Sequence, residues 1–361
     1  MPDAGGTPDP IEVGLFAYEI AKMRSAAITA AMVHLGDGLG LYRSLARMNR
    51  PVTSIEVAAE SGLVERWVRE WLYNQAAAGL VQVDESERFS MSAAAVAVLA
   101  DDQHELNLAG MFLALPGLMQ RVEVLPDSFR TGIGYDYDAH GRTLALGLER
   151  TFEPWMRDHL VADVLPQLDG VGDCLGVGTT AADIGCGAGG VVLALASAFP
   201  QSTILGFEIS EHALDRARAR LDDSGVGNAE FRNARESPLP QDHSLGFVTT
   251  FDCLHDMTDP AGMVEMIFRS LSADGTWLLV DIKAYDTFAE NVALNPMAAM
   301  MYGDSVLSCM SSALSEAGGA GLGTLGLSER KASEFAAAAG FTRFRRLEID
   351  HPVNAFYEIR P

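Results

Sequence analysis

A glycine-rich segment near the middle of the chain carries the residues whose types and spacing best support chemistry. Asp183 is followed by Gly185, Gly187 and Gly189, between a run that predicts a strand and one that predicts a helix. Glycines at such a turn let the backbone approach a ligand closely. Glu208 closes the next predicted strand, where a carboxylate can accept hydrogen bonds from both hydroxyls of a ribose. Tight turning without a ligand would explain the glycines but not the two acids, so we predict a cofactor site.

The glycine-rich segment could bind either of two cofactors, and the negative charge of Asp183 distinguishes between them. Gly185, Gly187 and Gly190 also satisfy the Gly-x-Gly-x-x-Gly spacing of dinucleotide-binding proteins. A dinucleotide would place its anionic pyrophosphate on the loop, where Asp183 repels it. S-adenosylmethionine carries an ammonium and a sulfonium, which an acid beside the loop attracts. We therefore predict S-adenosylmethionine as the cofactor and keep an NAD-dependent oxidoreductase as the alternative.

His255 is the residue best placed to remove a proton. It follows a predicted strand over 245–252, and it is the only histidine that the pattern places near the glycine-rich segment. Methyl transfer from a sulfonium is a direct displacement, so the enzyme contributes mainly alignment and removal of the acceptor's proton. We predict that His255 is the catalytic base for a hydroxyl acceptor. The alternative is that it only lines the cofactor pocket or caps the next helix.

Metal chemistry is not expected. The remaining histidines lack metal-ligand spacing such as His-x-x-x-His, and no Cys-x-x-Cys pair is present. The cysteines are widely scattered, as expected of reduced, small hydrophobic residues rather than a disulfide scaffold. They are Cys174, Cys186, Cys253 and Cys309.

An alternation of strands and helices after residue 179 positions these residues. Strands are predicted over 180–184, 203–209, 229–233, 245–252, 276–282, 345–349 and 355–359. Helices are predicted over 191–199, 211–222, 260–271 and 328–339. Only five residues separate the last two strands, so these strands form an antiparallel hairpin. The predicted fold class is α/β, a doubly wound sheet of seven strands.

Two segments interrupt or precede that alternation. Residues 284–327 look like an insertion after the fifth strand, either a lid above the carboxyl edge of the sheet or flexible packing filler. Residues 121–170 are predicted as a helical connector. Within it, 136–140 and 152–156 either border a substrate pocket or, as we favour, pack helices in the hinge region.

The N-terminal part, residues 1–120, has the element order of a winged helix-turn-helix domain. Its predicted elements are a helix over 11–35, a turn at 36–38, helices over 39–48, 54–62 and 65–78, and two strands over 80–83 and 88–91. Thr53 and Glu56 have the spacing of a capping box, which predicts where the third helix begins. The domain would serve in dimerisation or in capping the substrate site, ahead of a cofactor-binding domain over 171–361.

Charge decides whether this domain reads DNA. The whole chain has a formal net charge of −23, and residues 1–120 hold 15 acidic residues against 8 basic ones, a net charge of −7. The predicted recognition helix offers Arg66 and Arg69 but also Glu65 and Glu70. Nucleic-acid binding draws most of its affinity from neutralised phosphates, so we predict no nucleic-acid partner and no attraction to an anionic membrane surface.

Composition fits a globular cytoplasmic protein of 361 residues. Hydrophobic residues make up 48% and charged residues 21%. No apolar run reaches the roughly 20 residues that cross a bilayer, and no signal peptide is indicated. The first helix is apolar on most sides, which favours burial against a second copy in a homodimer.

At these residues the sequence resembles the class I S-adenosylmethionine-dependent methyltransferases, and more narrowly a bacterial group with an N-terminal winged-helix domain. The segments that carry the likeness are Phe-Asp-Cys-Leu-His-Asp-Met-Thr-Asp-Pro at 251–260, Asp-Gly-Thr-Trp at 274–277 and Ser-Ser-Ala-Leu-Ser-Glu at 311–316. The likeness covers nearly the whole chain. It implies methyl transfer to a small organic acceptor, most simply at oxygen, in a homodimer.

The resemblance also assigns roles within the site. It implies that Asp183, Gly185 and Gly187 contact the methionine part of the cofactor, Glu208 the ribose, and residues 233–235 the adenine. The full predicted cofactor set is Asp183, Gly185, Gly187, Gly189, Glu208, Ile209, Asn233, Ala234, Arg235 and Phe251. Where relatives have an acid for the adenine amino group, this chain has Arg235 followed by Glu236. The segment around His255 resembles small-molecule O-methyltransferases in which a separate carboxylate orients the histidine, and the sequence does not locate that carboxylate. Two further readings remain open, a winged-helix regulator that senses S-adenosylmethionine and a methyltransferase acting on protein or nucleic acid.

Overall fold

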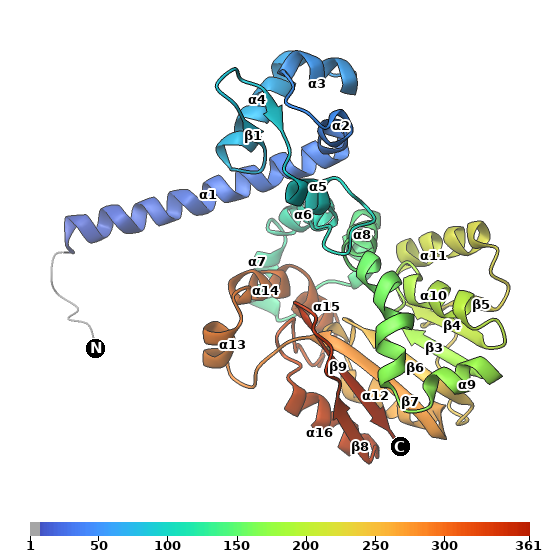
Figure 1. The fold of residues 1–361 in the computed structure, drawn as a ribbon. Coiled ribbons are helices and arrows are strands. Elements are labelled where there is room, and N and C mark those ends of the chain that lie inside the picture. Colours follow the sequence, from blue (N-terminus) through green and yellow to red (C-terminus); the bar gives the residue numbers. More distant parts are fainter. Residues whose placement is uncertain (1–7) are drawn as a thin grey trace. The chain divides into compact units, whose positions relative to one another are not determined.

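A computed structural model describes residues 8–361 of the protein. The chain forms two compact units, one ending at Pro116 and one over Gly117–Pro361 (Figure 1). Residues 121–170, predicted as a connector, fall within the second unit. Within residues 8–361, no helix is long and apolar enough to cross a membrane.

The first unit is helical apart from a short hairpin. Its elements are α1 (Pro10–Gly38), α2 (Leu41–Met48), α3 (Ser54–Ser61), α4 (Glu65–Ala77), β1 (Gln82–Val83), β2 (Phe89–Ser90) and α5 (Ala93–Leu99). The two strands pair antiparallel. Helices α3 and α4 followed by this wing confirm the predicted winged helix-turn-helix order.

The predicted capping box begins α3. The Thr53 side chain accepts a hydrogen bond from the Glu56 amide, and the Glu56 carboxylate accepts one from the Thr53 amide at 2.8 Å. The helix ends at Ser61, and the residue that caps it, Gly62, has a φ of 68°. The reciprocal bonds satisfy two amide groups that the first turn of a helix leaves unpaired.

The predicted turn at residues 36–38 is wrong, because α1 continues through it to Gly38 and the turn comes at Gly40, which has a φ of 70°. A Cβ atom at Gly36 would lie 2.3 Å from the Trp71 ring and 2.9 Å from the Tyr42 ring. The glycine at 36 therefore serves close packing of α1 on its neighbours and does not break the helix. Glycine has both uses, and local sequence does not distinguish them.

The second unit is built on the predicted seven-stranded sheet. Its strands are β3 (Thr180–Ile184), β4 (Thr203–Glu208), β5 (Ala229–Asn233), β6 (Leu245–Phe251), β7 (Leu271–Ile282), β8 (Arg343–Arg346) and β9 (Asn354–Arg360). Their order is β5-β4-β3-β6-β7-β9-β8, with β3 to β7 parallel and β9 antiparallel to both neighbours. Strand β7 begins five residues earlier than predicted, because Leu271 pairs with Leu245 beyond a register shift.

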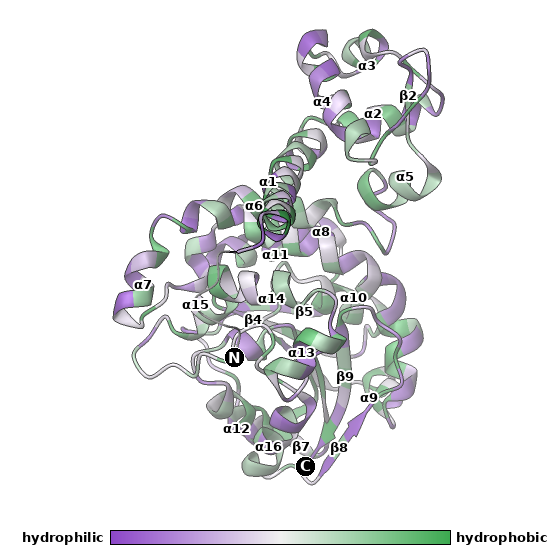
Figure 2. Cartoon of the chain, turned by 90° about the vertical axis from the view of Figure 1, so that its left-hand side faces the viewer, coloured by the Kyte–Doolittle hydropathy of each residue, from purple (hydrophilic) through white to green (hydrophobic). Residues whose placement is uncertain are grey.

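Helices cover both faces of this sheet, as a buried parallel sheet requires. They include α9 (Val171–Val177), α10 (Gly190–Ala198), α11 (Glu211–Ser224), α12 (Pro260–Ser270) and α16 (Glu329–Ala339). Along β3, Ala181 packs in the core shared with α10 and α11, and Ala182 packs in the core shared with α12 and α16. Neighbouring residues of one strand thus serve opposite faces, and hydrophobic residues run through the middle of the unit (Figure 2).

Two groups of helices lie outside the alternation. The first group, which precedes the sheet, contains α6 (Ala109–Arg121), α7 (Leu125–Thr131), η1 (Tyr137–His140), α8 (Arg142–His159), η2 (Leu160–Val164) and η3 (Leu165–Gln167). The insertion after β7 contains α13 (Phe288–Leu294), α14 (Ala298–Asp304), η5 (Ser305–Cys309) and α15 (Met310–Ala313), and η4 (Leu254–Asp256) follows β6. The Gly134 amide donates to the Leu314 carbonyl at 2.9 Å, so the insertion packs against the segment before η1.

Candidate active site

A cavity of about 690 Å³ opens at the carboxyl ends of the parallel strands. Its walls come from the glycine-rich loop after β3, the ends of β4 and β6, helices α8 and α12, and the insertion. The strand order reverses between β3 and β6, and ligands of doubly wound sheets bind at such a point. The volume is typical of a small-molecule site.

The glycine-rich loop depends on backbone conformations that favour glycine. Gly185, Gly187 and Gly189 have φ values of 69°, 52° and 83°. The amides of Gly185 and Cys186 both donate to the Phe207 carbonyl, at 2.8 and 3.1 Å. The start of the loop is thereby fixed to β4, with its backbone exposed to the cavity.

Glu208 is held by the backbone around it. One carboxylate oxygen accepts the Gly187 amide at 2.9 Å, and the other accepts the amides of Ile209 and Ser210 at 2.7 and 2.9 Å. Burial raises the pKa of Glu208, while these three amide bonds oppose the rise. Hydrogen bonds to Glu208 therefore connect the end of β4 with the glycine-rich loop, and Glu208 also lines the cavity.

Asp183 is a second buried acid beside the loop. Its carboxylate accepts the Thr249 hydroxyl at 2.7 Å, and burial raises its pKa to about 7. Within residues 8–361, neither Asp183 nor Glu208 has a lysine or arginine within ion-pair distance. A buried carboxylate without a positive partner is costly, and a cationic ligand supplies that partner.

Among the charged residues that line the cavity, acids outnumber arginines. Two arginines, Arg220 and Arg235, face nine acids, which are Asp136, Glu149, Glu153, Asp183, Glu208, Asp252, Asp256, Asp259 and Glu316. This excess suits the sulfonium and ammonium of S-adenosylmethionine and opposes an anionic pyrophosphate. The residues present therefore fit this cofactor.

Most of the predicted cofactor residues meet in this cavity. Those that line it are Asp183, Gly185, Gly187, Glu208, Ile209, Ala234, Arg235 and Phe251. Gly189 and Asn233, also predicted as cofactor residues, are not among the residues that line it. A Cβ atom at Gly189 would lie 2.4 Å from the Phe231 ring, so this glycine allows the loop to pack.

The turn after β5 joins the same wall. The Ala234 amide donates to the Glu208 carbonyl at 2.9 Å, which keeps the turn beside the acid. The Arg235 guanidinium pairs with Asp136, a residue that sequence reasoning placed only at a possible pocket border. Tyr137, Phe152, Glu153 and Met156 also line the cavity, so segments 136–140 and 152–156 border it.

His255 is paired with a carboxylate that the sequence did not reveal. Its Nδ1 lies 2.6 Å from Oδ1 of Asp281, and both side chains are 3% exposed. Asp281 stands near the end of β7, next to β6, whose end leads into η4 with His255. The other oxygen of Asp281 is buried, with no hydrogen-bond partner among residues 8–361.

The surroundings of this pair tune its protonation. Burial lowers the pKa of His255, but the Asp281 carboxylate and Cys309 outweigh burial and raise the pKa well above its usual value. Burial raises the pKa of Asp252 and of Asp256 to about 7. His255 itself lies just behind the cavity wall, which Asp252, Cys253 and Asp256 form at this point.

The sequence contains an indication of the role of Asp281 that the predictions above do not use. Asp281 is an acid near the end of the apolar run Trp-Leu-Leu-Val-Asp-Ile, at the strand edge where ligands bind. Asp252 adopts a φ of 49°, a backbone conformation uncommon outside glycine, and its carboxylate accepts a hydrogen bond from the side-chain Nδ2 of Asn354. No local pattern indicates this strain, because Asn354 is 102 residues away.

Comparisons with known proteins agree with this geometry. The sequence matches the family model of a methyltransferase domain over residues 175–338 and that of an Rv2258c-like winged HTH domain over residues 26–100. No curated protein matches the sequence.

Solved structures share the fold over nearly the whole chain. A putative O-methyltransferase from Nostoc punctiforme PCC 73102 has a TM-score of 0.71 at 16% identity, covering 98% of this chain and 99% of that one. The mitomycin 7-O-methyltransferase MmcR has a TM-score of 0.67 at 18% identity, with 98% and 99% covered. An O-methyltransferase from neocarzinostatin biosynthesis, solved with S-adenosylmethionine and 2-hydroxy-5-methyl naphthoic acid, has a TM-score of 0.61 at 18% identity, with 92% and 95% covered.

The matched domains, the doubly wound sheet and the acidic cavity at its reversal point lead to one conclusion. The chain is a two-domain, S-adenosylmethionine-dependent methyltransferase, in which a winged helix-turn-helix domain precedes the methyltransferase domain.

Proposed function

We propose that this enzyme methylates a hydroxyl oxygen of a small organic acceptor and that His255 is the catalytic base. The observation that carries the proposal is the buried His255–Asp281 pair, 2.6 Å apart, at the edge of the cofactor cavity. An amine acceptor that is already neutral needs no such base, whereas a hydroxyl oxygen does.

Asp183, Glu208 and the glycine loop would hold the cofactor, with Ala234 and Arg235 on the adenine side. Bound S-adenosylmethionine supplies a methyl group on a positively charged sulfur. Asp281 fixes the imidazole with its Nδ1 toward the carboxylate, and the Cys309 side chain is a second hydrogen-bond partner of this imidazole. We propose that Nε2 is the atom that accepts the proton of the acceptor hydroxyl. The positive charge of bound S-adenosylmethionine would oppose protonation of His255. The imidazole would then remain neutral and able to act as a base.

The acceptor is expected to be apolar and uncharged or cationic. Leu148, Phe152, Met156, Met257 and Met263 line the cavity beside the acids. Methionines adapt to irregular apolar ligands, and the acids disfavour an anionic group. The neocarzinostatin enzyme, solved with 2-hydroxy-5-methyl naphthoic acid, supports an aromatic hydroxyl as the first class to screen. Aromatic acceptors without a carboxylate come first here, because the acids of this cavity would repel that group.

The test measures methyl transfer to phenols of graded acidity with wild type and His255→Ala. The variant is expected to bind S-adenosylmethionine normally but to lose about 10²–10⁴-fold in kcat with weakly acidic phenols. Phenols that are already ionised should recover most of this loss, because they need no base. Equal losses across the series, or none, would show that His255 does not remove the proton.

The winged domain is proposed to bind no nucleic acid. On α4, Arg66 pairs with Glu70 at 2.5 Å and Arg69 with Glu65 at 3.4 Å. Both arginines of the helix that would enter a groove are therefore neutralised within that helix, in a domain of negative net charge. Fluorescence anisotropy with mixed-sequence duplexes at low salt should show no binding, and tight binding would instead favour a regulator.

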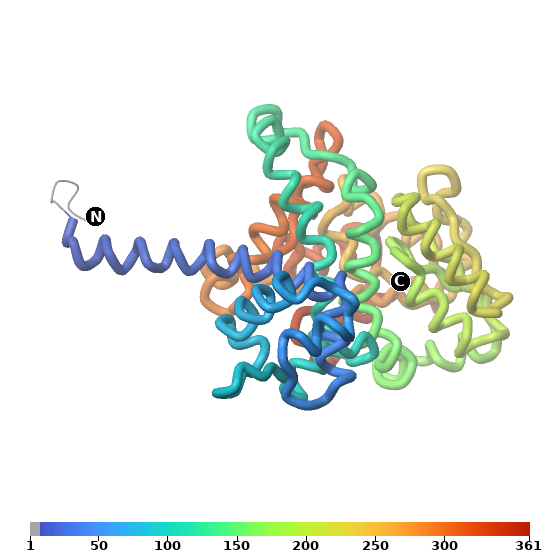
Figure 3. Tube along the Cα trace, turned by 90° about the horizontal axis from the view of Figure 1, so that it is seen from above, coloured from blue at the N-terminus to red at the C-terminus, as the bar shows by residue number. Residues whose placement is uncertain are grey.

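We also propose a homodimer formed through α1. This helix exposes large apolar side chains along its length, including Ile11, Leu15, Phe16, Tyr18 and Met23, each at least 64% exposed. Its N-terminal half extends from the rest of the winged unit (Figure 3). A helix apolar on most sides requires a partner surface of the same kind, which a second copy provides. Sedimentation should give twice the chain mass for wild type and a lower mass for Phe16→Glu; a monomeric wild type would refute the dimer.

The proposed location is the cytoplasm. All four cysteines are free, and thiols persist in a reducing compartment. Fractionation of cells that express the tagged protein tests this assignment.

A further inference from the structure

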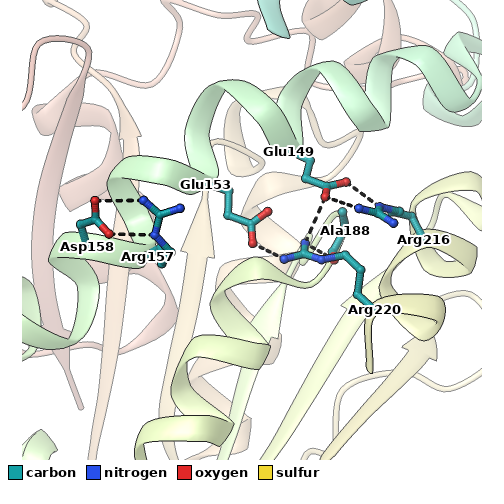
Figure 4. Close-up of polar contacts among 7 residues, drawn as sticks. All are labelled: Glu149, Glu153, Arg157, Asp158, Ala188, Arg216 and Arg220. Atoms are coloured by element: carbon teal, nitrogen blue, oxygen red, sulfur yellow. Dashed lines mark hydrogen bonds and ion pairs between the residues drawn. The ribbon is translucent and has the colours of Figure 1, made fainter. Parts of the chain in front are cut away.

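Helix α8 and helix α11 meet through two arginine–glutamate pairs above the glycine loop (Figure 4). Arg216 of α11 binds Glu149 of α8 with two hydrogen bonds, of 2.9 and 2.8 Å. One turn further along, Arg220 pairs with Glu153. The two pairs join the same helices, but they differ in what else they touch.

Arg220 alone of the two arginines also contacts the glycine loop. Its Nη1 donates to the Ala188 carbonyl at 2.9 Å, and the same nitrogen lies 3.7 Å from Glu149. Its side chain is only 18% exposed, and Glu153 is 25% exposed. The guanidinium therefore bridges α8, α11 and the loop, using a forked set of donors that a lysine does not have.

The Arg220 contact with Ala188 adds a side-chain anchor to the second half of the loop. The first half is fixed to β4 through Phe207 and Glu208, whereas Ala188 follows those anchors. Three glycines with left-handed φ values make the loop costly to order, because glycine loses more conformational freedom than other residues. Glu153 also packs on the loop, since a Cβ atom at Gly190 would lie 3.2 Å from its carboxyl carbon.

We propose that Arg220, held by Glu153, is a positioning residue that orders residues 188–190 for cofactor binding and couples helix α8 to the cofactor site. The inference rests on the cofactor site proposed above. It gives a role to α8, whose Glu149, Phe152 and Glu153 line the same cavity. Arg220 acts through the loop backbone, so its effect should fall on cofactor affinity and not on the chemical step.

The experiment compares Arg220→Met with the matched control Arg216→Met, which breaks the neighbouring pair and leaves the loop contact. Calorimetric titration with S-adenosylhomocysteine should show roughly tenfold weaker binding for Arg220→Met and less than twofold for Arg216→Met. Hydrogen exchange at the amides of residues 187–191 should quicken only in Arg220→Met. At saturating S-adenosylmethionine, kcat should be unchanged while its KM rises.

Two further variants test whether Arg220 acts by positioning the loop or only through its positive charge, and a folding check accompanies them. Arg220→Lys keeps the charge but loses the fork, so it should bind the cofactor almost as weakly as Arg220→Met; full rescue by lysine would overturn the proposal. Glu153→Gln should weaken binding less than Arg220→Met, and circular dichroism checks that each variant is folded. If wild type binds no S-adenosylhomocysteine, the cofactor site itself fails; if Arg220→Met equals wild type in affinity and exchange, only the positioning role fails.

Discussion

The buried carboxylate of the winged unit and the two buried carboxylates beside the glycine-rich loop have different partners. In the described part of the winged unit, Asp37 is the buried carboxylate, and Arg43 pairs with it at 3.0 Å. In the methyltransferase unit, Asp183 and Glu208 are buried without a basic partner in ion-pair distance, and their neighbours are backbone amides and a threonine hydroxyl.

This difference shows where the molecule gives up stability for binding. Isolated buried carboxylates destabilise a fold, so they persist where a ligand compensates for their charge. Several exposed acids of the winged unit pair with arginines away from any cofactor site, as between Arg47 and Glu60 at 3.1 Å. Substitutions in the methyltransferase unit should therefore change chemistry and binding, and those in the winged unit should change stability.

The largest effect is expected from Asp281→Asn. The asparagine keeps the shape but removes the charge that orients and favours the His255 imidazolium, so kcat should fall about 10²-fold or more. Asp281 raises the pKa of His255, and the neutral imidazole is the active form. The rising limb of log kcat/KM against pH should therefore move to lower pH in the variant. An unchanged pH profile would separate Asp281 from the catalytic base.

A smaller effect is expected from Glu208→Gln. The amide cannot accept on both sides, so one of the three backbone amides loses its partner, and the attraction to a cation is lost. A hydrogen bond to a charged group contributes about 1.5–3 kcal/mol, so S-adenosylmethionine should bind roughly 10–100-fold more weakly by calorimetry. Glu358→Gln, which alters a buried acid paired with Arg345 at 2.6 Å, is the control and should leave affinity unchanged. If Glu208→Gln and Glu358→Gln weakened S-adenosylmethionine binding equally, the unpaired acid at the cavity would have no special role in cofactor binding.

Next in size is the pH dependence of cofactor binding. The pKa of Asp183 is raised to about 7, so this acid is mostly neutral at pH 6 and mostly ionised at pH 8. Affinity for the cationic S-adenosylmethionine should rise about tenfold over that range, and less in Asp183→Asn. Between about pH 4 and 7 Asp183 keeps its proton in the folded protein but loses it in the unfolded chain, so the contribution of Asp183 to apo stability falls as pH rises through this window. Cofactor affinity that is flat from pH 6 to 8 would argue against a neutral Asp183.

The smallest effect is expected in the winged unit. Thr53→Ala removes the side-chain half of the capping box of α3, which should lower the free energy of unfolding by about 0.5–2 kcal/mol. The melting temperature measures this loss, and kcat and the affinity for S-adenosylmethionine should stay at wild-type values. A drop in kcat at saturating substrates would mean that the winged unit takes part in the chemistry.

Much of the fold follows from the sequence because its signals are local. The alternation of apolar runs and amphipathic stretches predicts all seven strands, and the short link before β9 predicts its antiparallel pairing. The carboxyl ends of parallel strands meet at one edge, so the sequence predicts that Asp183, Glu208 and His255 lie near the same edge of the sheet. The spacing from Thr53 to Glu56 likewise fixes where α3 begins.

Tertiary structure alone decided the partners of these residues. Asp281 lies 26 residues from His255, and Glu153 lies 67 residues from Arg220, and neither pairing leaves a periodic or spacing signal. Gly36 shows the same limit, because only the Trp71 ring packed against it shows that this glycine continues a helix. Periodicity in the sequence predicts which face of a helix or strand is buried. It does not predict which side chain contacts that face, because the contact forms only when elements distant in the sequence pack against each other.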